Sequence, residues 1–92
     1  MRYPCSVWLL PSGGRRRPLI RSPYSMAIGM PGLEALYGSA ALHFDAARAW
    51  GLGETRKGSV KFMFWEEFPE PLKGRPFEVR EGPCVVGEGV FL

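Results

Sequence analysis

Short apolar runs separated by glycine and proline follow one another along this chain, and they predict strands joined by tight turns. Residues 5–10 form the first run, with Val7 and Leu9 on one face, and a Gly-Gly pair shortly after it marks a turn. A return strand is expected to start at residues 18–20, and residues 24–30 give a further strand. The start of the chain is therefore predicted to be a β-hairpin followed by another strand.

The strongest strand candidate covers residues 60–68, where Val60, Phe62 and Phe64 would share one face. The stretch before it, residues 51–59, is predicted to be a loop. That loop superficially resembles a phosphate-binding P-loop, but its order is Lys-Gly-Ser instead of Gly-Lys-Ser. We therefore expect no nucleotide binding there.

Residues 75–92 form two further apolar runs around a Glu-Gly-Pro break at residues 81–83, which predicts a final hairpin. Gly87 and Gly89 lie within the second run. Glycine inside a strand pattern indicates a bulge, a sharp bend or the close approach of another backbone. A chain that ends in such a strand is expected to close a barrel on itself, because closure removes an exposed sheet edge.

Residues 31–53 carry two conflicting patterns. Six apolar residues between Leu33 and Ala47 fall at helical spacing, which allows a helix. Gly38 interrupts that helix, and residues 41–46 alternate like a strand. Strand is favoured over helix across residues 39–46, and both alternatives stay open.

Composition places the chain among small globular domains. Of its 92 residues 46% are apolar and 23% are charged, which suits a single domain, residues 1–92, and not a disordered tail. Twelve glycines and nine prolines favour strands and turns over a helical bundle. We therefore expect an all-β fold, a small closed or nearly closed antiparallel barrel of about six strands. The sequence shows no membrane-spanning run and no secretory signal, so a cytoplasmic location is expected.

Patterns for catalysis and metal binding are sparse. His43 has Asp45 two positions on, a spacing that would place both on one face of a strand, but no nucleophile accompanies them. Two cysteines and one histidine cannot complete a four-ligand zinc site without carboxylates. Cys5 and Cys84 are expected to be buried free thiols, with a disulfide between them as the alternative. We expect no enzymatic activity, no metal and no cofactor.

Positive charge is concentrated at the start of the chain. Residues 1–30 carry five arginines and no acid, whereas residues 31–92 carry seven basic and nine acidic residues. Arg15, Arg16 and Arg17 follow the Gly-Gly pair, so they are expected on or beside a loop tip. The planar guanidinium group suits phosphate and carboxylate recognition. The loop is therefore a candidate anion-binding site, with a simply solvated turn as the alternative.

The turns at the two ends of the chain form a recognisable set. Arg80-Glu81-Gly82 is followed by Val-Gly-Glu-Gly-Val at residues 86–90, and Gly13-Gly14-Arg15-Arg16 follows the first predicted strand. These segments resemble the R-E-G-G turn, the V-G-x-G-V strand and the G-G-R-H loop in the C-terminal β-barrel domain of the elongation factor Tu family. The resemblance covers about residues 5–20 and 58–92.

In that family the loop and the turn together grip the backbone of the T stem of aminoacyl-tRNA, so the resemblance implies RNA binding by the matching residues. Arg16 replaces the family's histidine and keeps a hydrogen-bond donor. Pro83 replaces a glycine and removes a backbone N–H, and Glu88 replaces a small residue of the strand. The family's GTP-hydrolysing domain and second barrel have no counterpart in this sequence.

We expect a non-catalytic module that binds structured RNA, such as tRNA, through an arginine-rich hairpin loop and an Arg-Glu-Gly turn. The expected site residues are Gly14, Arg15, Arg16, Arg17, Arg21, Arg80, Glu81 and Gly82. The alternative is a protein-interaction module that docks on a translation-related or other cytoplasmic partner, with tryptophans as its anchors. The candidate anchors are Trp8, Trp50 and Trp65. Neither a membrane nor a nucleotide is expected as a partner.

Overall fold

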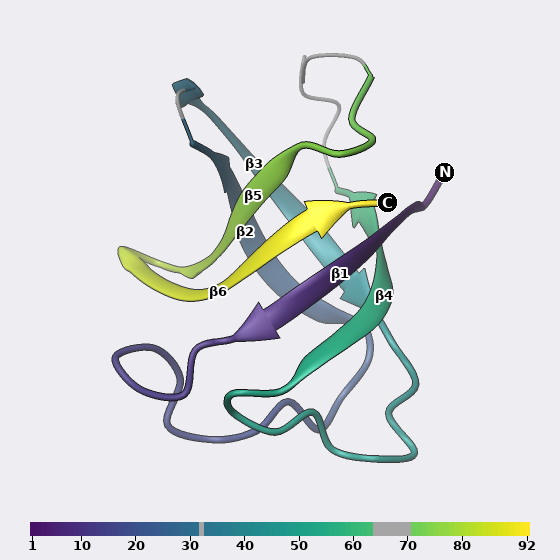
Figure 1. Cartoon of the computed structure of the whole chain (residues 1–92), viewed down its shortest axis with the longest axis vertical. Helices are drawn as coiled ribbons and strands as arrows, with labels where there is room; N and C mark the ends of the chain where they lie inside the picture. Colours follow the sequence, from purple (N-terminus) through teal and green to yellow (C-terminus); the bar gives the residue numbers. More distant parts are fainter. Residues whose placement is uncertain (32, 64–70) are drawn as a thin grey trace.

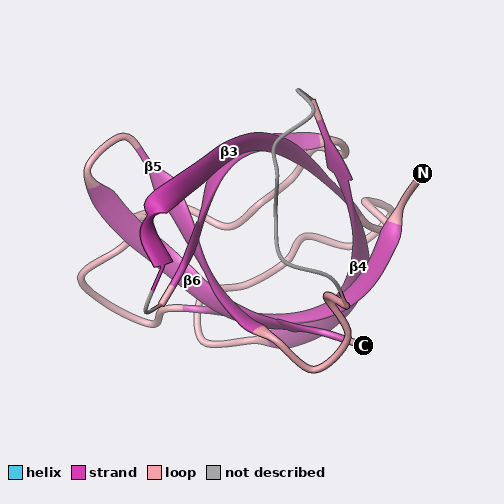
Figure 2. Cartoon of the chain, turned by 90° about the horizontal axis from the view of Figure 1, so that it is seen from above, coloured by secondary structure: helices cyan, strands magenta, loops and turns pink. Residues whose placement is uncertain are grey.

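The computed structural model describes residues 1–31, 33–63 and 71–92, and this part of the chain forms a closed antiparallel β-barrel (Figure 1). The strands are β1 (Tyr3–Leu9), β2 (Tyr24–Met30), β3 (Leu33–His43), β4 (Thr55–Phe62), β5 (Pro76–Glu81) and β6 (Cys84–Phe91). Around the barrel they follow the order β1-β4-β3-β2-β5-β6, with β6 returning to β1. Seen from above, the strands curve around a common interior (Figure 2). The predicted all-β class and closed six-stranded barrel are confirmed. The described residues contain no helix that is long and apolar enough to cross a membrane.

The last strand closes the barrel, as the glycine-containing run at the end of the chain predicted. β6 pairs with β5 on one side and with β1 on the other, where Cys5 lies opposite Phe91. The β5–β6 turn has two central residues, Gly82 and Pro83. Gly82 has a φ of +59°, which glycine adopts without strain at the first position of such a turn. Val86 is the extra residue of a bulge in β6, which confirms that the strand is irregular.

Alternate strand residues fill the barrel. Val7 and Leu9 of β1 are fully buried, whereas Trp8 between them is 37% exposed. The Phe77 and Phe91 rings pack against each other in the core with centroids 4.5 Å apart. All strands and three loops contribute buried apolar side chains: Cys5, Val7, Leu9, Leu19, Met26, Ile28, Met30, Ala40, Leu42, Trp50, Val60, Leu72, Phe77, Val79, Val86 and Phe91.

The predicted return strand at residues 18–20 is wrong. Residues 10–23, hereafter the arginine loop, form a long connection in which an isolated bridge links Leu19 to Trp50. The three prolines of this loop cannot donate ladder hydrogen bonds. Leu19 and Trp50 are both buried, so their side chains close the end of the barrel and fix the position of the loop. β1 takes β4 and β6 as its partners instead.

The ambiguous middle of the chain is a strand. β3 confirms the strand preference for residues 39–43, and it also occupies residues 33–37, where the apolar spacing allowed a helix. The helix is wrong there, because Tyr37 and Leu33 pair with Gly29 and Met30 of β2. Pairing in the sheet overrides the helical spacing of single residues. Residue 32 lies outside the described residues.

The loop that follows β3 separates the predicted His43 and Asp45 pair. β3 ends at His43, and Asp45 lies in the loop, where its carboxylate accepts a hydrogen bond of 3.0 Å from the Ala47 N–H. The two side chains therefore do not share a strand face, and that prediction is wrong. Short polar side chains favour this kind of local hydrogen bond over continuing a strand.

β4 begins earlier than predicted. Residues 55–59 were expected in a loop, but they pair with β1, where Trp8 lies opposite Thr55. A Cβ atom at Gly58 would lie 2.6 Å from the carbonyl oxygen of His43, so glycine is needed for β3 and β4 to approach this closely. Residues 64–68 of the predicted strand lie outside the described residues, and Trp65 is among them.

The two cysteines are both free and lie near opposite ends of β6. Cys5 is buried, as expected, and its partner position on β6 is Phe91. Cys84 is exposed because it follows the β5–β6 turn directly, so the expectation of a buried thiol is wrong there. The alternative, a disulfide, does not form. Burial raises the pKa of the Cys5 thiol to about 11.

Candidate nucleic-acid interface

The arginine loop folds back against β6 after leaving β1, at the lower left of Figure 1. The Leu10 N–H donates a hydrogen bond of 3.0 Å to the carbonyl oxygen of Val86. A Cβ atom at Gly14 would lie 2.9 Å from the Cα atom of Val86, which is too close for any other residue without a shift of the backbone. Gly14 therefore acts as a packing residue that brings the loop onto the barrel wall.

Arg15 links the arginine loop to the β5–β6 turn. Its guanidinium group donates a hydrogen bond to the Glu81 carboxylate and forms an ion pair with it. The guanidinium carbon also lies 5.3 Å from the centroid of the Tyr24 ring, a cation–π distance. The loop near the start of the chain and the turn near its end therefore lie on the same side of the barrel.

Tyr24 completes this contact from β2. Its hydroxyl group donates a hydrogen bond to the same carboxylate oxygen of Glu81. Burial, followed by the hydrogen bond to Glu81, raises the pKa of the Tyr24 phenol above its ordinary value. The phenol is therefore protonated at neutral pH and is available as a donor. Arg15, Tyr24 and Glu81, hereafter the strut, join the arginine loop, β2 and the end of β5.

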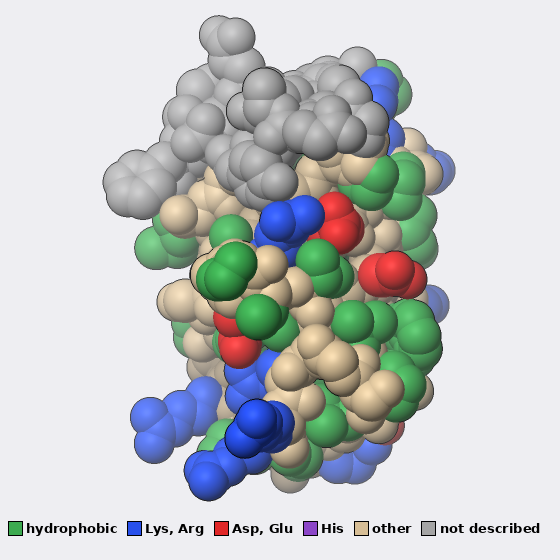
Figure 3. Space-filling model, turned by 90° about the vertical axis from the view of Figure 1, so that its left-hand side faces the viewer, with side chains coloured by type: hydrophobic (Ala, Val, Ile, Leu, Met, Phe, Trp, Pro, Cys, Tyr) green, Lys and Arg blue, Asp and Glu red, His purple; other side chains and the backbone are tan. Residues whose placement is uncertain are grey.

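Within the strut the charges of Arg15 and Glu81 neutralise each other, although both residues were expected to contact RNA. Arg15 and Glu81 offset each other's charge, and the Arg15 Nε–H is also used, in a hydrogen bond of 2.9 Å to the Arg17 carbonyl oxygen. Arg16, Arg17 and Arg21 are exposed. Figure 3 faces this side of the barrel, and several Lys and Arg side chains project from its lower end. The exposed arginines are therefore the groups that can reach an external anion.

Arg80 lies on β5, directly before Glu81. Its Nη2 atom is 3.3 Å from a carboxylate oxygen of Glu78, so part of its charge is compensated within the barrel wall. Arg80 and Gly82 also line a hollow of about 570 Å³, together with the hydroxyl-bearing Ser25 and Ser39. This hollow places one guanidinium group and two hydroxyl groups next to the strut.

A second loop joins this end of the barrel, and no motif in the sequence indicates it. Residues 44–54 connect β3 to β4, and the Leu19–Trp50 bridge ties them to the arginine loop. Arg56 holds the connection together, because its guanidinium group donates hydrogen bonds to the carbonyl oxygens of Asp45 (2.7 Å) and Arg48 (3.0 Å). The contacts of Arg56 could not be predicted from the sequence, because its partners are backbone atoms of a loop.

Charge at this end of the molecule is strongly positive. The segments 10–23 and 44–57 together hold seven basic and two acidic residues. One of the acids, Glu54, forms an ion pair of 2.6 Å with Arg48, and this hydrogen bond lowers the pKa of the Glu54 carboxyl. Among the described residues no cluster of three His, Cys, Asp or Glu side chains could hold a metal ion. The excess of basic side chains gives this surface a charge that attracts anions.

Of the tryptophans expected as protein-interaction anchors, one is excluded. Trp50 is fully buried, with its Nε1–H donating a hydrogen bond of 2.9 Å to the Glu54 carbonyl oxygen, so that prediction is wrong. Trp50 is a core residue, and the backbone bridge to Leu19 holds it at the end of the barrel. Trp8 is partly exposed on the outer wall. No protein-family model matches this chain, and no curated protein matches it either.

Proposed function

We propose that this protein is a non-catalytic module that binds the phosphate backbone of structured RNA, such as tRNA, at the arginine-rich end of its barrel. The proposal includes a relationship to the C-terminal barrel domain of the elongation factor Tu family. The observation that supports it most directly is the contact of Arg15 with Glu81. The resemblance requires the arginine loop and the Arg-Glu-Gly turn to act together, and this contact joins them.

The proposal divides the site residues into two groups. The strut sets the position of the arginine loop. Gly14 allows the loop to pack closely on β6, and Gly82 allows the neighbouring β5–β6 turn. The exposed Arg16, Arg17 and Arg21 contact phosphate oxygens. A-form RNA suits this arrangement, because proteins recognise it through its shape and backbone more than through base edges.

Binding of this kind depends strongly on salt, because each phosphate contact releases counterions. If three phosphates are neutralised, the affinity falls about 40-fold between 50 and 200 mM salt, taking the duplex-DNA slope as a guide. The Arg80 hollow adjoins the turn and places a guanidinium group and two hydroxyl groups beside the Glu81 carboxylate.

A gel-shift titration with total tRNA tests the proposal. The triple variant Arg16→Glu, Arg17→Glu, Arg21→Glu is expected to abolish the salt-sensitive shift. A control with the same change in net charge replaces Arg2, Lys61 and Lys73 by Glu. Arg2 and Lys61 lie near His43, and neither residue belongs to the arginine loop. A triple variant that shifts like the wild type, or a control that loses binding equally, would contradict the proposal.

A further inference from the structure

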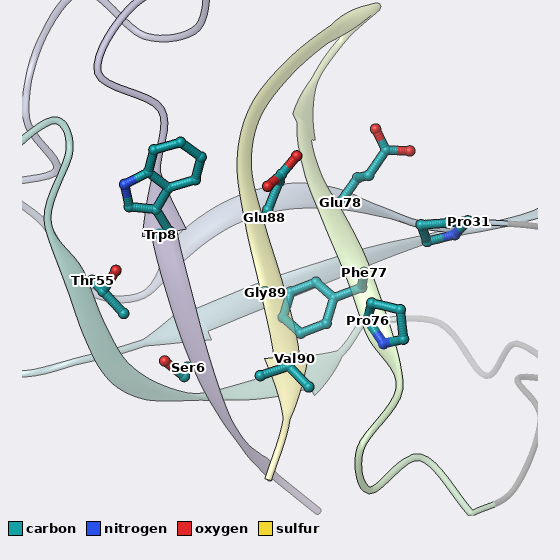
Figure 4. A pocket seen from close by; sticks show the side chains of 10 residues that line it. All are labelled: Ser6, Trp8, Pro31, Thr55, Pro76, Phe77, Glu78, Glu88, Gly89 and Val90. Carbon is teal, nitrogen blue, oxygen red and sulfur yellow. The ribbon is translucent and has the colours of Figure 1, made fainter.

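A shallow groove of about 670 Å³ lies on the outer wall of the barrel, over β1, β6 and β5 (Figure 4). It uses none of the residues of the arginine loop or the strut. Trp8, Glu88 and Glu78 line it together with the apolar side chains of Pro31, Pro76 and Val90. A groove of this size accepts several residues of an extended chain or one small molecule.

Gly89 forms part of the floor of the groove, with the Phe77 ring packed closely behind it. A Cβ atom at Gly89 would lie 2.4 Å from the Cζ atom of Phe77, whose ring packs against β6 at this point (Figure 4). Phe77 therefore covers the glycine from the core side, as aromatic residues do opposite glycine in paired strands. The backbone of Gly89 is therefore left as the floor between the charged side chains, and the buried Phe77 ring lies beneath it.

One wall of the groove is a fixed indole ring. Trp8 is 37% exposed, and its Nε1–H donates a hydrogen bond of 3.2 Å to the Gly53 carbonyl oxygen, which holds the ring in place. Strand pairing puts Trp8 opposite Glu88, and Glu88 in turn opposite Glu78. An indole and two carboxylates therefore form a row across the three strands, which Figure 4 shows directly.

The row has an unfavourable charge arrangement. Carboxylates directly opposite each other on antiparallel strands repel and destabilise the sheet. Arg80 lies 3.3 Å from Glu78 and offsets part of that charge. Within the described residues no basic side chain forms an ion pair with Glu88, which is exposed. The groove is therefore negative, and a positive group placed in it would relieve the repulsion.

We propose that this groove binds a basic side chain, lysine or arginine, presented by an extended segment of a protein partner. The cation lies against the indole face of Trp8 and pairs with Glu88, a combination of cation–π and charge-assisted contacts. The aliphatic part of the side chain packs on Pro76 and Val90. Charge complementarity selects a basic segment over an acidic or purely apolar one. The site is independent of the RNA-binding proposal.

A titration followed by ¹H–¹⁵N nuclear magnetic resonance tests this site. The probe is a capped pentapeptide with arginine at its centre and valine on either side. Its matched control carries glutamate in place of arginine. The arginine peptide is expected to shift the indole N–H of Trp8 and the amides of Gly89 and Val90 in a saturable way. The glutamate peptide is expected to leave them unchanged. Equal shifts with both peptides, or shifts elsewhere on the barrel, would overturn the proposal.

Variants of Glu88 separate binding from folding. Glu88→Gln is expected to weaken binding of the arginine peptide about fivefold. The isosteric control Asp45→Asn, at an exposed acid in the loop between β3 and β4, is expected to have no effect. Glu88→Lys is expected to abolish peptide binding and yet raise the melting temperature, because it places an ammonium group opposite Glu78. A variant that loses both binding and stability would indicate a structural role for Glu88 and contradict the proposal.

A second copy of this chain is the competing occupant, since its arginine loop is also basic. Sedimentation velocity on the wild type and on Glu88→Lys distinguishes the two. The proposal expects a monomer in both cases. A wild-type oligomer that the substitution dissolves would assign the groove to self-association and overturn the assignment to a partner protein.

Discussion

Arg15 and Glu81 lie 66 positions apart in the sequence, and their side chains form an ion pair on the outside of the barrel. The same carboxylate accepts the hydrogen bond of Tyr24, whose ring lies under the guanidinium group. The arginine loop contains no strand, so its position depends on such contacts and on the Leu19–Trp50 bridge. The strut thus converts a long irregular connection into a fixed surface.

A double-mutant cycle with Arg15→Ala and Glu81→Ala is expected to give a coupling free energy of about 0.5–1 kcal/mol in urea unfolding. The two side chains are only 21% and 38% exposed, which places the pair at the upper end of surface ion pairs. The Arg48–Glu54 pair, in which the arginine is 67% exposed, is the control and is expected to couple more weakly. Equal coupling free energies in the two pairs would contradict the stabilising role of the strut.

Gly89→Ala is expected to destabilise the barrel by about 1–3 kcal/mol, because the new methyl group collides with a Phe77 ring already packed on Phe91. Gly51→Ala is the matched control. It has no atoms within 4 Å of the new Cβ and no positive φ, so its effect should be small. Thermal unfolding of both variants measures the difference. If Gly89→Ala destabilises the barrel no more than Gly51→Ala does, the Phe77 ring moves aside freely.

Stability is expected to fall in alkaline solution as pH rises from about 9 to about 11. The pKa of Cys5 is about 11 in the folded chain and 9.0 as its ordinary value, so the unfolded chain releases this proton first. Within that window the folded state binds more protons, and its free energy of unfolding falls by about 1.4 kcal/mol per pH unit for this group.

Tyr24, whose pKa is also raised, acts in the same direction. Urea unfolding between pH 8 and 11 measures the decline, and Cys5→Ala is expected to reduce its slope. A slope that Cys5→Ala leaves unchanged would assign the alkaline sensitivity to other groups.

Arg17→Ala is expected to reduce the slope of log affinity against log salt for RNA by about one, because one phosphate contact is lost. Lys73→Ala, at an exposed position in the loop before β5, is expected to leave the slope unchanged. Fluorescence anisotropy with a labelled RNA hairpin at several salt concentrations gives both slopes. Equal changes in the two variants would mean that binding follows net charge and not a defined surface.

The barrel itself was largely predictable from the sequence, and the errors in the predicted strands have a common cause. Apolar alternation located β1, β2 and the final hairpin, because in these strands one face fills the core. The polar segment Thr55–Ser59 gave no such signal, and it is a strand only because β1 and β3 lie beside it. The apolar residues 18–20 gave a false signal, because Leu19 is buried as a plug and not as part of a ladder.

The candidate site was predictable in its composition but not in its geometry. The arginine run and the Arg-Glu-Gly turn are visible in the sequence, and the resemblance joined them. Nothing local shows that Arg15 pairs with Glu81, or that Arg56 braces a loop through backbone carbonyls. Nor does the sequence show the groove at Trp8, which arises from strand register across β1, β6 and β5.

The most direct test of the RNA-binding account is to map the contact surface by ¹H–¹⁵N nuclear magnetic resonance with a short A-form RNA hairpin. The account predicts that the shifts concentrate in the arginine loop, including the side-chain Nε–H groups of Arg16, Arg17 and Arg21, and in the adjoining β5–β6 turn. Shifts centred on the outer faces of β3 and β4, or no saturable shift at low salt, would contradict it.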